Sequence, residues 1–250
     1  MSGPNNSKIR HARFAIVAAL RQEVSAVVRG WGQREIEYGG RKLRFYESEK
    51  AVLVCGGIGA QAANIAAQAA LICYRPQGML SAGVAGSLSS NLNAGEAFLV
   101  SAVIDAVSGK TYAALLGTRR LVTAGKILGP EEKRELAQRY SAHAVDMEAA
   151  AVAEVAAQAG LPFYAAKAIS DQLDFPMPPM DRFVDASGNF ATGKFVLHAA
   201  LRPAMWPVVW RLARNNHRAA EALARVVQPL IDGQNLHSDA IESGIAQIKH

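Results

Sequence analysis

The feature that most restricts the fold of this chain is the alternation of short apolar runs with longer helical patterns. Most of these runs are continuously apolar instead of alternating with polar residues, which is typical of strands covered on both faces. Their order predicts an α/β fold whose twisted, mixed but largely parallel central sheet is flanked by helices. The expected strands are FAIVAAL (14–20), AVLVCGG (51–57), GMLSAG (78–83), AFLVSAVI (97–104), RLVTA (120–124) and FYAAKAIS (163–170), and the expected helices cover 21–30, 60–74, 130–140 and 147–159.

A hairpin and a single domain complete the expected architecture. Gly39 and Gly40 accept the positive φ angles of a tight turn, so they predict a β-hairpin within REIEYGGRKLRFYESE. The chain has 250 residues, 50% of them hydrophobic, which is enough to bury the core of one sizeable α/β domain. We expect this domain to span 14–231, with flexible tails at 1–13 and 232–250.

Composition narrows the compartment and the partners. Cys55 and Cys73 lie inside apolar runs and form no paired motif, which suits a reducing compartment. No apolar run reaches the roughly 18 residues that span a bilayer, and the N-terminus has no cleavage-like site, so we expect a cytoplasmic location. The net charge of +6 is spread along the chain, and nucleic acid is therefore not an expected partner.

Neither a nucleotide cofactor nor a metal is expected. GIGAQA (57–62) matches the G-x-G-x-x-A pattern of dinucleotide-binding folds, but no acidic residue for the ribose hydroxyls occurs between 51 and 95. Glycine here is better explained by a tight strand-to-helix turn. A second glycine turn, SAGVAGSL (81–88), also lacks a phosphate-binding lysine. The histidines show no metal-ligand spacing; they are His11, His143, His198, His217, His237 and His250.

Three carboxylates occupy positions where a solvated surface charge is not the first expectation. Glu23 follows the first strand in ALRQEV, and Asp171 ends FYAAKAISD. If the stretch 144–160 is helical, Glu148 lies on the same apolar side as Val145, whereas Asp146 points away. Each has a structural explanation: a first-turn charge for Glu23, an N-cap for Asp171 and a buried ion pair for Glu148. Their joint placement at one end of a sheet favours a shared site instead.

Several motifs together resemble one enzyme family. VDMEAAAVAEV and PFYAAKAISD, preceded in order by ALRQEV, GGIG and SAGVAGSL, resemble the 5′-methylthioadenosine/S-adenosylhomocysteine nucleosidases and the related purine nucleoside phosphorylases. The resemblance extends from about Phe14 to Asp171. It implies a homodimeric enzyme, without a cofactor, that cleaves the N-glycosidic bond of an adenosine derivative. A small-molecule nucleoside is therefore the implied partner.

The resemblance also implies roles for individual residues. Asp171 would be the general acid that protonates the purine at N7, and Glu23 would orient and deprotonate the attacking water. Glu148 would hold the ribose 2′ and 3′ hydroxyls. The other implied substrate contacts are Ser81 and Gly83 near the ribose and water, Met147 against the sugar, Ile127 and Leu128 at the base, and Ser170 beside the acid.

Two departures from the family pattern bear on the reaction. Only DAVSGKTYAALLGTRR (105–120) stands where the family nucleosidases carry a longer loop-rich segment, so part of the pocket wall must be rebuilt. Lys167 replaces the arginine expected before AISD. Phosphorolysis would need arginines near the glycine turns to bind a phosphate dianion, and Arg21 is better explained as a solvated residue. Hydrolysis is therefore favoured, with a phosphate-dependent phosphorylase as the alternative.

The C-terminal segment 201–231 predicts a helical appendage of two helices divided near Asn215 and Asn216. Basic residues greatly outnumber acidic ones there, and Trp206 and Trp210 are spaced by one helical turn. One interpretation is a helical pair that packs on the sheet with both tryptophans in the core. The other is an interfacial helix that uses aromatic and basic side chains at an anionic membrane surface.

The shortened middle segment and this tail resemble the hopanoid-associated branch of the family. That resemblance implies hopanoid biosynthesis, a lipid-linked substrate such as adenosylhopane, and a position peripheral to the inner membrane. A non-catalytic nucleoside-binding or membrane-binding protein is a further alternative. It has no need for Glu23, Glu148 and Asp171 together, and the presence of all three acids favours an enzyme.

Overall fold

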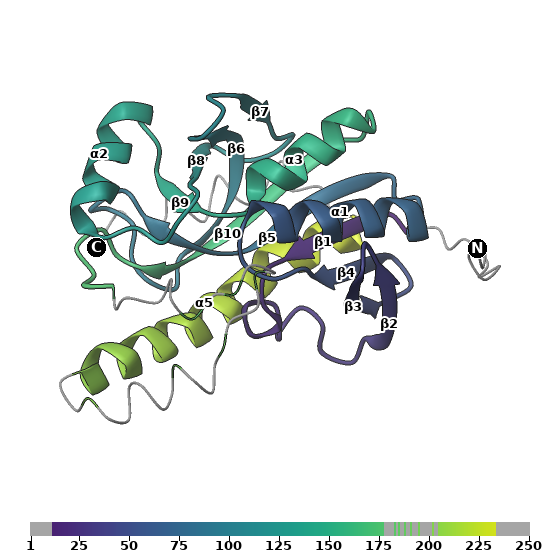
Figure 1. Cartoon of the computed structure of the whole chain (residues 1–250), viewed down its shortest axis with the longest axis horizontal. Helices are drawn as coiled ribbons and strands as arrows, with labels where there is room; N and C mark the ends of the chain where they lie inside the picture. The colour runs from purple at the N-terminus through teal and green to yellow at the C-terminus, as the bar shows by residue number, and fades with distance from the viewer. Residues whose placement is uncertain are drawn as a thin grey trace.

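The computed structural model describes residues 12–177 and 205–233, together with residues 183, 185, 188, 191, 195 and 202. In this part of the chain, one ten-stranded mixed sheet carries helices on both faces (Figure 1). The strands are β1 (Phe14–Ala18), β2 (Gly32–Tyr38), β3 (Arg41–Glu47), β4 (Ala51–Cys55), β5 (Gly78–Ser87), β6 (Ala97–Asp105), β7 (Thr111–Ala113), β8 (Arg119–Thr123), β9 (Ala144–Asp146) and β10 (Phe163–Asp171). The helical elements are the 3₁₀ turn η1 (Arg21–Glu23), α1 (Ala60–Tyr74), α2 (Pro130–Tyr140), α3 (Ala149–Gln158) and α5 (Trp206–Asp232).

The strand pairing brings distant segments together at one end of the sheet. β1 is parallel to both β4 and β5, and β5 is parallel to β10, while the hairpin of β2 and β3 adds antiparallel strands at one edge. β10 also pairs with β6, and β6, β8, β9 and β5 follow in order, so five strands form a closed ring of pairings. In this register Gly86 lies opposite both Asp171 and Val145.

Two apolar layers cover the sheet. On one face α1 and α3 pack against each other and the strands, mostly through alanines. The approach is close, because a Cβ added at Gly56 would lie 2.7 Å from the Cβ of Ala66. This proximity explains the glycine turn between β4 and α1. On the other face α5 packs on β5, β6, β10 and η1, and it buries Ala219, Leu223 and Val227.

The six expected strands are confirmed with shifted ends, the hairpin is confirmed, and the helices over 60–74 and 130–140 are confirmed with the predicted bounds. The expected helix over 21–30 is wrong, because only Arg21–Glu23 forms a 3₁₀ turn. Burial explains the difference: Val24 and Val28 lie in the core, and Glu23 turns inward to accept a hydrogen bond from Val84 N–H. The strands β7 and β9 were not predicted, since three residues are too few to show a pattern.

The expected division of segment 201–231 is also wrong, because α5 continues through Asn215 and Asn216. Its apolar stripe runs across them from Leu212 to Leu223, so packing outweighs the weak helix propensity of asparagine. Both tryptophans of the helix are more than half exposed, so the interpretation that buries them is wrong as well. The expected tails lie outside the described residues, except for 12–13 and 232–233.

Candidate active site

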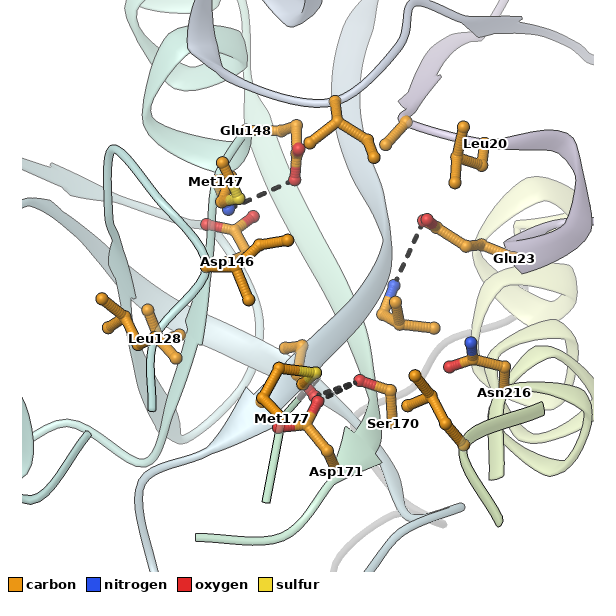
Figure 2. Close-up of a pocket in the computed structure, with 18 of the residues that line it drawn as sticks. Leu20, Glu23, Leu128, Asp146, Met147, Glu148, Ser170, Asp171, Met177 and Asn216 are labelled. Atoms are coloured by element: carbon orange, nitrogen blue, oxygen red, sulfur yellow. Dashed lines mark hydrogen bonds between the residues drawn. The ribbon is translucent and has the colours of Figure 1, made fainter. Parts of the chain in front are cut away.

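A pocket opens beyond the carboxyl ends of β1, β5 and β10, where ligands bind in parallel α/β sheets. Figure 2 shows the three predicted carboxylates around it, with Asp171 at one end and Glu148 and Glu23 on opposite sides, and a fourth carboxylate, Asp146, beside Met147. Three different elements supply them, since Glu23 closes η1, Glu148 precedes α3 and Asp171 ends β10. Seven of the nine predicted site residues line this pocket: Glu23, Ile127, Leu128, Met147, Glu148, Ser170 and Asp171.

Glu23 is held in a largely apolar corner. Its Oε2 accepts a hydrogen bond from Val84 N–H at 3.4 Å. A Cβ added at Gly83 would lie 2.8 Å from the same oxygen, so glycine leaves room for the carboxylate. Burial raises the pKa of Glu23 to about 8, and the nearby charge of Glu148 adds to the rise, while Lys167 opposes it. Only the ionised form of Glu23 can accept a proton, and the raised pKa makes that form a stronger base than an ordinary carboxylate.

Glu148 occupies the N-cap position of α3, because the helix begins at Ala149 and not at 147. The predicted helix face is therefore wrong, since Val145 belongs to β9. The Glu148 carboxylate accepts hydrogen bonds from Gly59 N–H at 2.8 Å and from Met147 N–H at 3.2 Å. Burial and then the charge of Asp146 raise the pKa of Glu148 to about 7. The glycine turn before α1 thus positions the Glu148 side chain through Gly59 N–H, and the Glu148 carboxylate faces the pocket.

Asp171 is bound through both carboxylate oxygens. Ser170 Oγ donates to Oδ1 at 2.6 Å, and Lys133 Nζ forms an ion pair with Oδ2. Lys133 also donates to the backbone oxygen of Gln172 at 3.0 Å. Both charged side chains are almost fully buried. The pair places an ammonium group directly behind the acid at this end of the pocket.

A second buried ion pair joins Asp146, which lines the pocket, to Lys167, which does not. Lys167 Nζ contacts Asp146 Oδ2 at 2.8 Å and donates to Ser81 Oγ at 3.2 Å. Asp146 also accepts hydrogen bonds from Thr123 Oγ1 at 2.7 Å and from Ala149 N–H at 2.9 Å. The expectation that Asp146 points away from the core is therefore wrong. Burial opposes the charge of Lys167, but the carboxylates of Asp146 and Glu148 outweigh it and raise the lysine pKa.

Ser81 and Gly83, the other two predicted site residues, do not line the pocket. Ser81 accepts the Lys167 hydrogen bond from below, and Gly83 packs against Glu23. The structure thus places both one layer deeper than the seven residues at the surface of the pocket. The small residues Ser81 and Gly83 leave space for the charged side chains of Lys167 and Glu23 next to β5.

The pocket also contains residues that sequence patterns did not single out, chiefly Lys133, Leu212 and Asn216. A signal existed for Lys133, because it lies on the apolar stripe of α2 at the spacing of Leu136 and Ala137. For Asn216 the pattern favoured a helix break. Its Oδ1 is buried without a hydrogen-bond partner, and Figure 2 shows the side chain on the wall below Glu23.

In the part of the chain that the structure describes, no cluster of three or more His, Cys, Asp or Glu side chains could hold a metal ion. His11, His198, His237 and His250 lie outside that part. Within the same limits, none of the helices is sufficiently long and apolar to cross a bilayer. The carboxyl, ammonium and hydroxyl groups that line the pocket can supply acid–base chemistry and hydrogen bonds.

A mixed sheet with acids gathered beyond its strand ends defines a ligand-binding α/β protein of the nucleoside phosphorylase-like fold. The chain belongs to the phosphorylase superfamily, which it matches over residues 13–123 and 111–228. No curated protein matches the sequence significantly.

Solved structures share this fold at low sequence identity. The 5′-methylthioadenosine/S-adenosyl homocysteine nucleosidase of Helicobacter pylori is 17% identical, with a TM-score of 0.67 over 90% of this chain and 99% of that one. The futalosine hydrolase of H. pylori strain 26695 is also 17% identical, with a TM-score of 0.66 over 90% and 98%. The nucleosidase of Neisseria meningitidis, in complex with methylthio-immucillin-A, is 19% identical, with a TM-score of 0.61 over 86% and 98%.

Proposed function

We propose that this protein is a nucleosidase that hydrolyses the N-glycosidic bond of a 5′-modified adenosine and releases adenine. The observation that carries the proposal is the convergence of Glu23, Glu148 and Asp171 on one pocket from three separate elements. Similar solved structures include a 5′-methylthioadenosine/S-adenosyl homocysteine nucleosidase and a futalosine hydrolase, which supports the proposal. A purely structural role would not require two acids with pKa values raised to about 8 and about 7.

Each of the three acids can serve one change of charge or proton transfer in the reaction. Cleavage of C1′–N9 builds positive charge on the ribose and negative charge on the purine. In our proposal Asp171 is the acid at the base, and Glu148 binds the 2′ and 3′ hydroxyls. Glu23 takes a proton from the water that attacks C1′. The apolar contacts of Leu128 and Met147 would hold the base and the sugar between these groups.

The cations of the pocket favour water over phosphate as the nucleophile. Among the described residues, no arginine lines the pocket, and its cations are Lys126 and Lys133. Each already contacts a carboxylate: Lys126 contacts Glu132 at 2.5 Å, and Lys133 contacts Asp171. A phosphate dianion needs cationic donors that remain available to it. Neither lysine offers such a cradle, and we therefore prefer hydrolysis to phosphorolysis.

We expect the purified protein to release adenine from 5′-methylthioadenosine, S-adenosylhomocysteine or a lipid-linked adenosine at the same rate with and without phosphate. The reason is that the pocket residues that the structure describes do not form a cationic binding site for phosphate. Free adenine and the reducing sugar would be followed by chromatography. Strict dependence on phosphate, with formation of ribose 1-phosphate derivatives, would replace the proposal with its phosphorylase alternative.

A lipid-linked substrate such as adenosylhopane would suit the surface beside the pocket, and we include it in the proposal. The first turns of α5 extend beyond the sheet (Figure 1) and expose Trp206 and Trp210. Arg214 stacks over Trp210, with its guanidinium carbon 5.1 Å from the ring centroid. Leu212, on the same helix, lines the pocket. Aromatic and basic side chains on one helix end are typical of an interfacial contact with anionic lipid.

On this basis we propose a cytoplasmic homodimer that contacts the inner membrane peripherally and acts in hopanoid biosynthesis.

We expect vesicles that contain anionic lipid to sediment the protein at low salt and to release it at high salt, because basic side chains contribute to binding. The Trp206→Ser/Trp210→Ser double variant should sediment less. The matched control is Ile72→Ser/Leu115→Ser, whose positions are similarly exposed at 58% and 61% but lie on α1 and between β7 and β8. Equal sedimentation of the tryptophan variant and the wild type would count against the membrane contact.

A further inference from the structure

Lys133 is the charged group whose position the proposed roles of the three acids do not explain. It is only 2% exposed, although α2 offers a solvated face on which a lysine could lie. Its ammonium group contacts Asp171 Oδ2 and the backbone oxygen of Gln172. Lys133 also lines the pocket, so the ion pair is part of the pocket wall and not of a remote core.

The sheet leaves room for this ion pair at Gly86. A Cβ at that position would lie 3.1 Å from Asp171 Oδ2 and 3.2 Å from Lys133 Nζ. The register explains this proximity, because Gly86 is the β5 residue opposite Asp171. A larger residue would therefore press on both charged groups at once. The buried ion pair thus depends on three elements: α2 supplies Lys133, β10 supplies Asp171, and β5 leaves space for both at Gly86.

Stability alone is a weak reason for such a contact. Two charges lose their hydration when they are buried, and apolar replacements of buried ion pairs are often neutral or stabilising. An ammonium group has three N–H donors, and the hydrogen bonds to Asp171 and Gln172 use two of them. The ammonium group also carries protons of its own, and it contacts the carboxylate oxygen of the proposed acid.

We propose that Lys133 supplies, through Asp171, the proton that the leaving purine receives. This inference rests on the proposed nucleosidase function. As the C1′–N9 bond breaks, its electron pair passes to the purine, Lys133 Nζ gives a proton to Asp171 Oδ2, and the Asp171 carboxyl group gives a proton to N7. The water that attacks C1′ gives its hydroxyl group to the sugar and its proton to Glu23. Exchange of protons with solvent then restores both Lys133 and Glu23.

In this scheme Lys133 is a positioning residue that acts through Asp171, whereas Lys167 serves the opposite side of the pocket. Lys167 donates to Asp146 and Ser81 and does not line the pocket. Ser170 completes the arrangement, because its hydroxyl group donates to Asp171 Oδ1 and leaves Oδ2 to the lysine. The base end of the site therefore contains a short proton path from Lys133 to Asp171.

The test compares two leaving groups on the same 5-modified ribose: adenine, which needs a proton, and p-nitrophenolate, which leaves as an anion. The variants are Lys133→Met, which removes the charge, and Lys133→Arg, which keeps the ion pair but holds its protons too tightly to release them. We expect both variants to lose about 10²-fold or more in kcat for adenine release, as for a lost proton donor. Both should cleave the nitrophenyl substrate at nearly the wild-type rate.

Two controls separate the possible failures. Lys110→Met removes an exposed lysine that pairs with Glu154, and it should not affect either substrate. Glu148→Gln should impair both substrates, since both present the same sugar. Adenine release at the wild-type rate by Lys133→Arg would overturn the proton path, and so would equal losses on both substrates by that variant if it folds normally. If the wild type cleaves neither substrate, the proposed function itself fails.

Discussion

Replacing Asp171 by asparagine should lower kcat for adenine release by about 10² to 10⁴, the usual contribution of a positioned proton donor. The amide has nearly the same shape as the carboxyl group but cannot pass a proton to N7. Ser170 Oγ could still donate to the side-chain oxygen, so the local geometry is largely retained. Initial rates at saturating substrate would measure the effect, and KM should change much less than kcat.

The same substitution leaves Lys133 buried without its counterion, which is destabilising by about 3–5 kcal/mol in comparable cases. The Asp171→Asn/Lys133→Met double variant removes both charges and provides the control. We expect it to recover most of the lost free energy of unfolding and none of the lost activity. An Asp171→Asn protein that is folded and nearly fully active would exclude Asp171 as the acid.

Glu23→Gln should lower activity and raise stability at once. Glutamine cannot accept a proton from the attacking water, and we expect a loss of about 10² to 10⁴ in kcat. In the folded protein burial raises the pKa of Glu23 from 4.5 to about 8. Between these values the unfolded chain releases a proton that the folded protein retains, so the wild type loses stability as pH rises. The full stability is present below pH 4.5, and the loss is complete above pH 8.

The glutamine variant lacks this ionisation and should therefore exceed the wild type in free energy of unfolding by several kcal/mol at about pH 9. At about pH 4 the two proteins should differ little. Urea unfolding at both pH values would measure the difference. Glu35→Gln, at a side chain exposed on β2, is the matched control and should show no such trend. A variant that is less stable than the wild type at the higher pH would contradict a strained, buried carboxyl group at position 23.

The sequence predicted the strands better than it predicted the roles of charged residues. Continuous apolar runs located six strands, because burial on both faces leaves that pattern directly in the chain. The acids Glu23 and Asp171 could be found because each follows such a run. Glu148 was also found, but for a reason that is wrong, since it precedes the helix whose face it was assigned to.

The missed residues share one property: their partners are distant in the chain. Asp146 pairs with Lys167, and Lys133 pairs with Asp171, across separations that no local pattern reports. α5 shows the same limitation, because Asn215 weakens a helix locally while the packing of Leu212 and Leu223 on the sheet sustains it. The wall residue Asn216 was hidden by the same local signal.

The pocket has two parts that are attached to the fold in different ways. One part lies on the closed ring of paired strands, and the other does not. β10 is bonded to β5 and β6, and backbone bonds from Ile169 to Gly95 and Glu96 extend this attachment almost to Asp171. Leu20, Leu212 and Asn216 belong instead to a wall formed by α5 and the residues around η1, outside the strand ladder. Substitutions in that wall could change which nucleoside the pocket accepts without displacing the acid. The position of Asp171 is therefore structurally separable from the residues of this wall, whereas Glu23, at the end of η1, belongs to the wall itself.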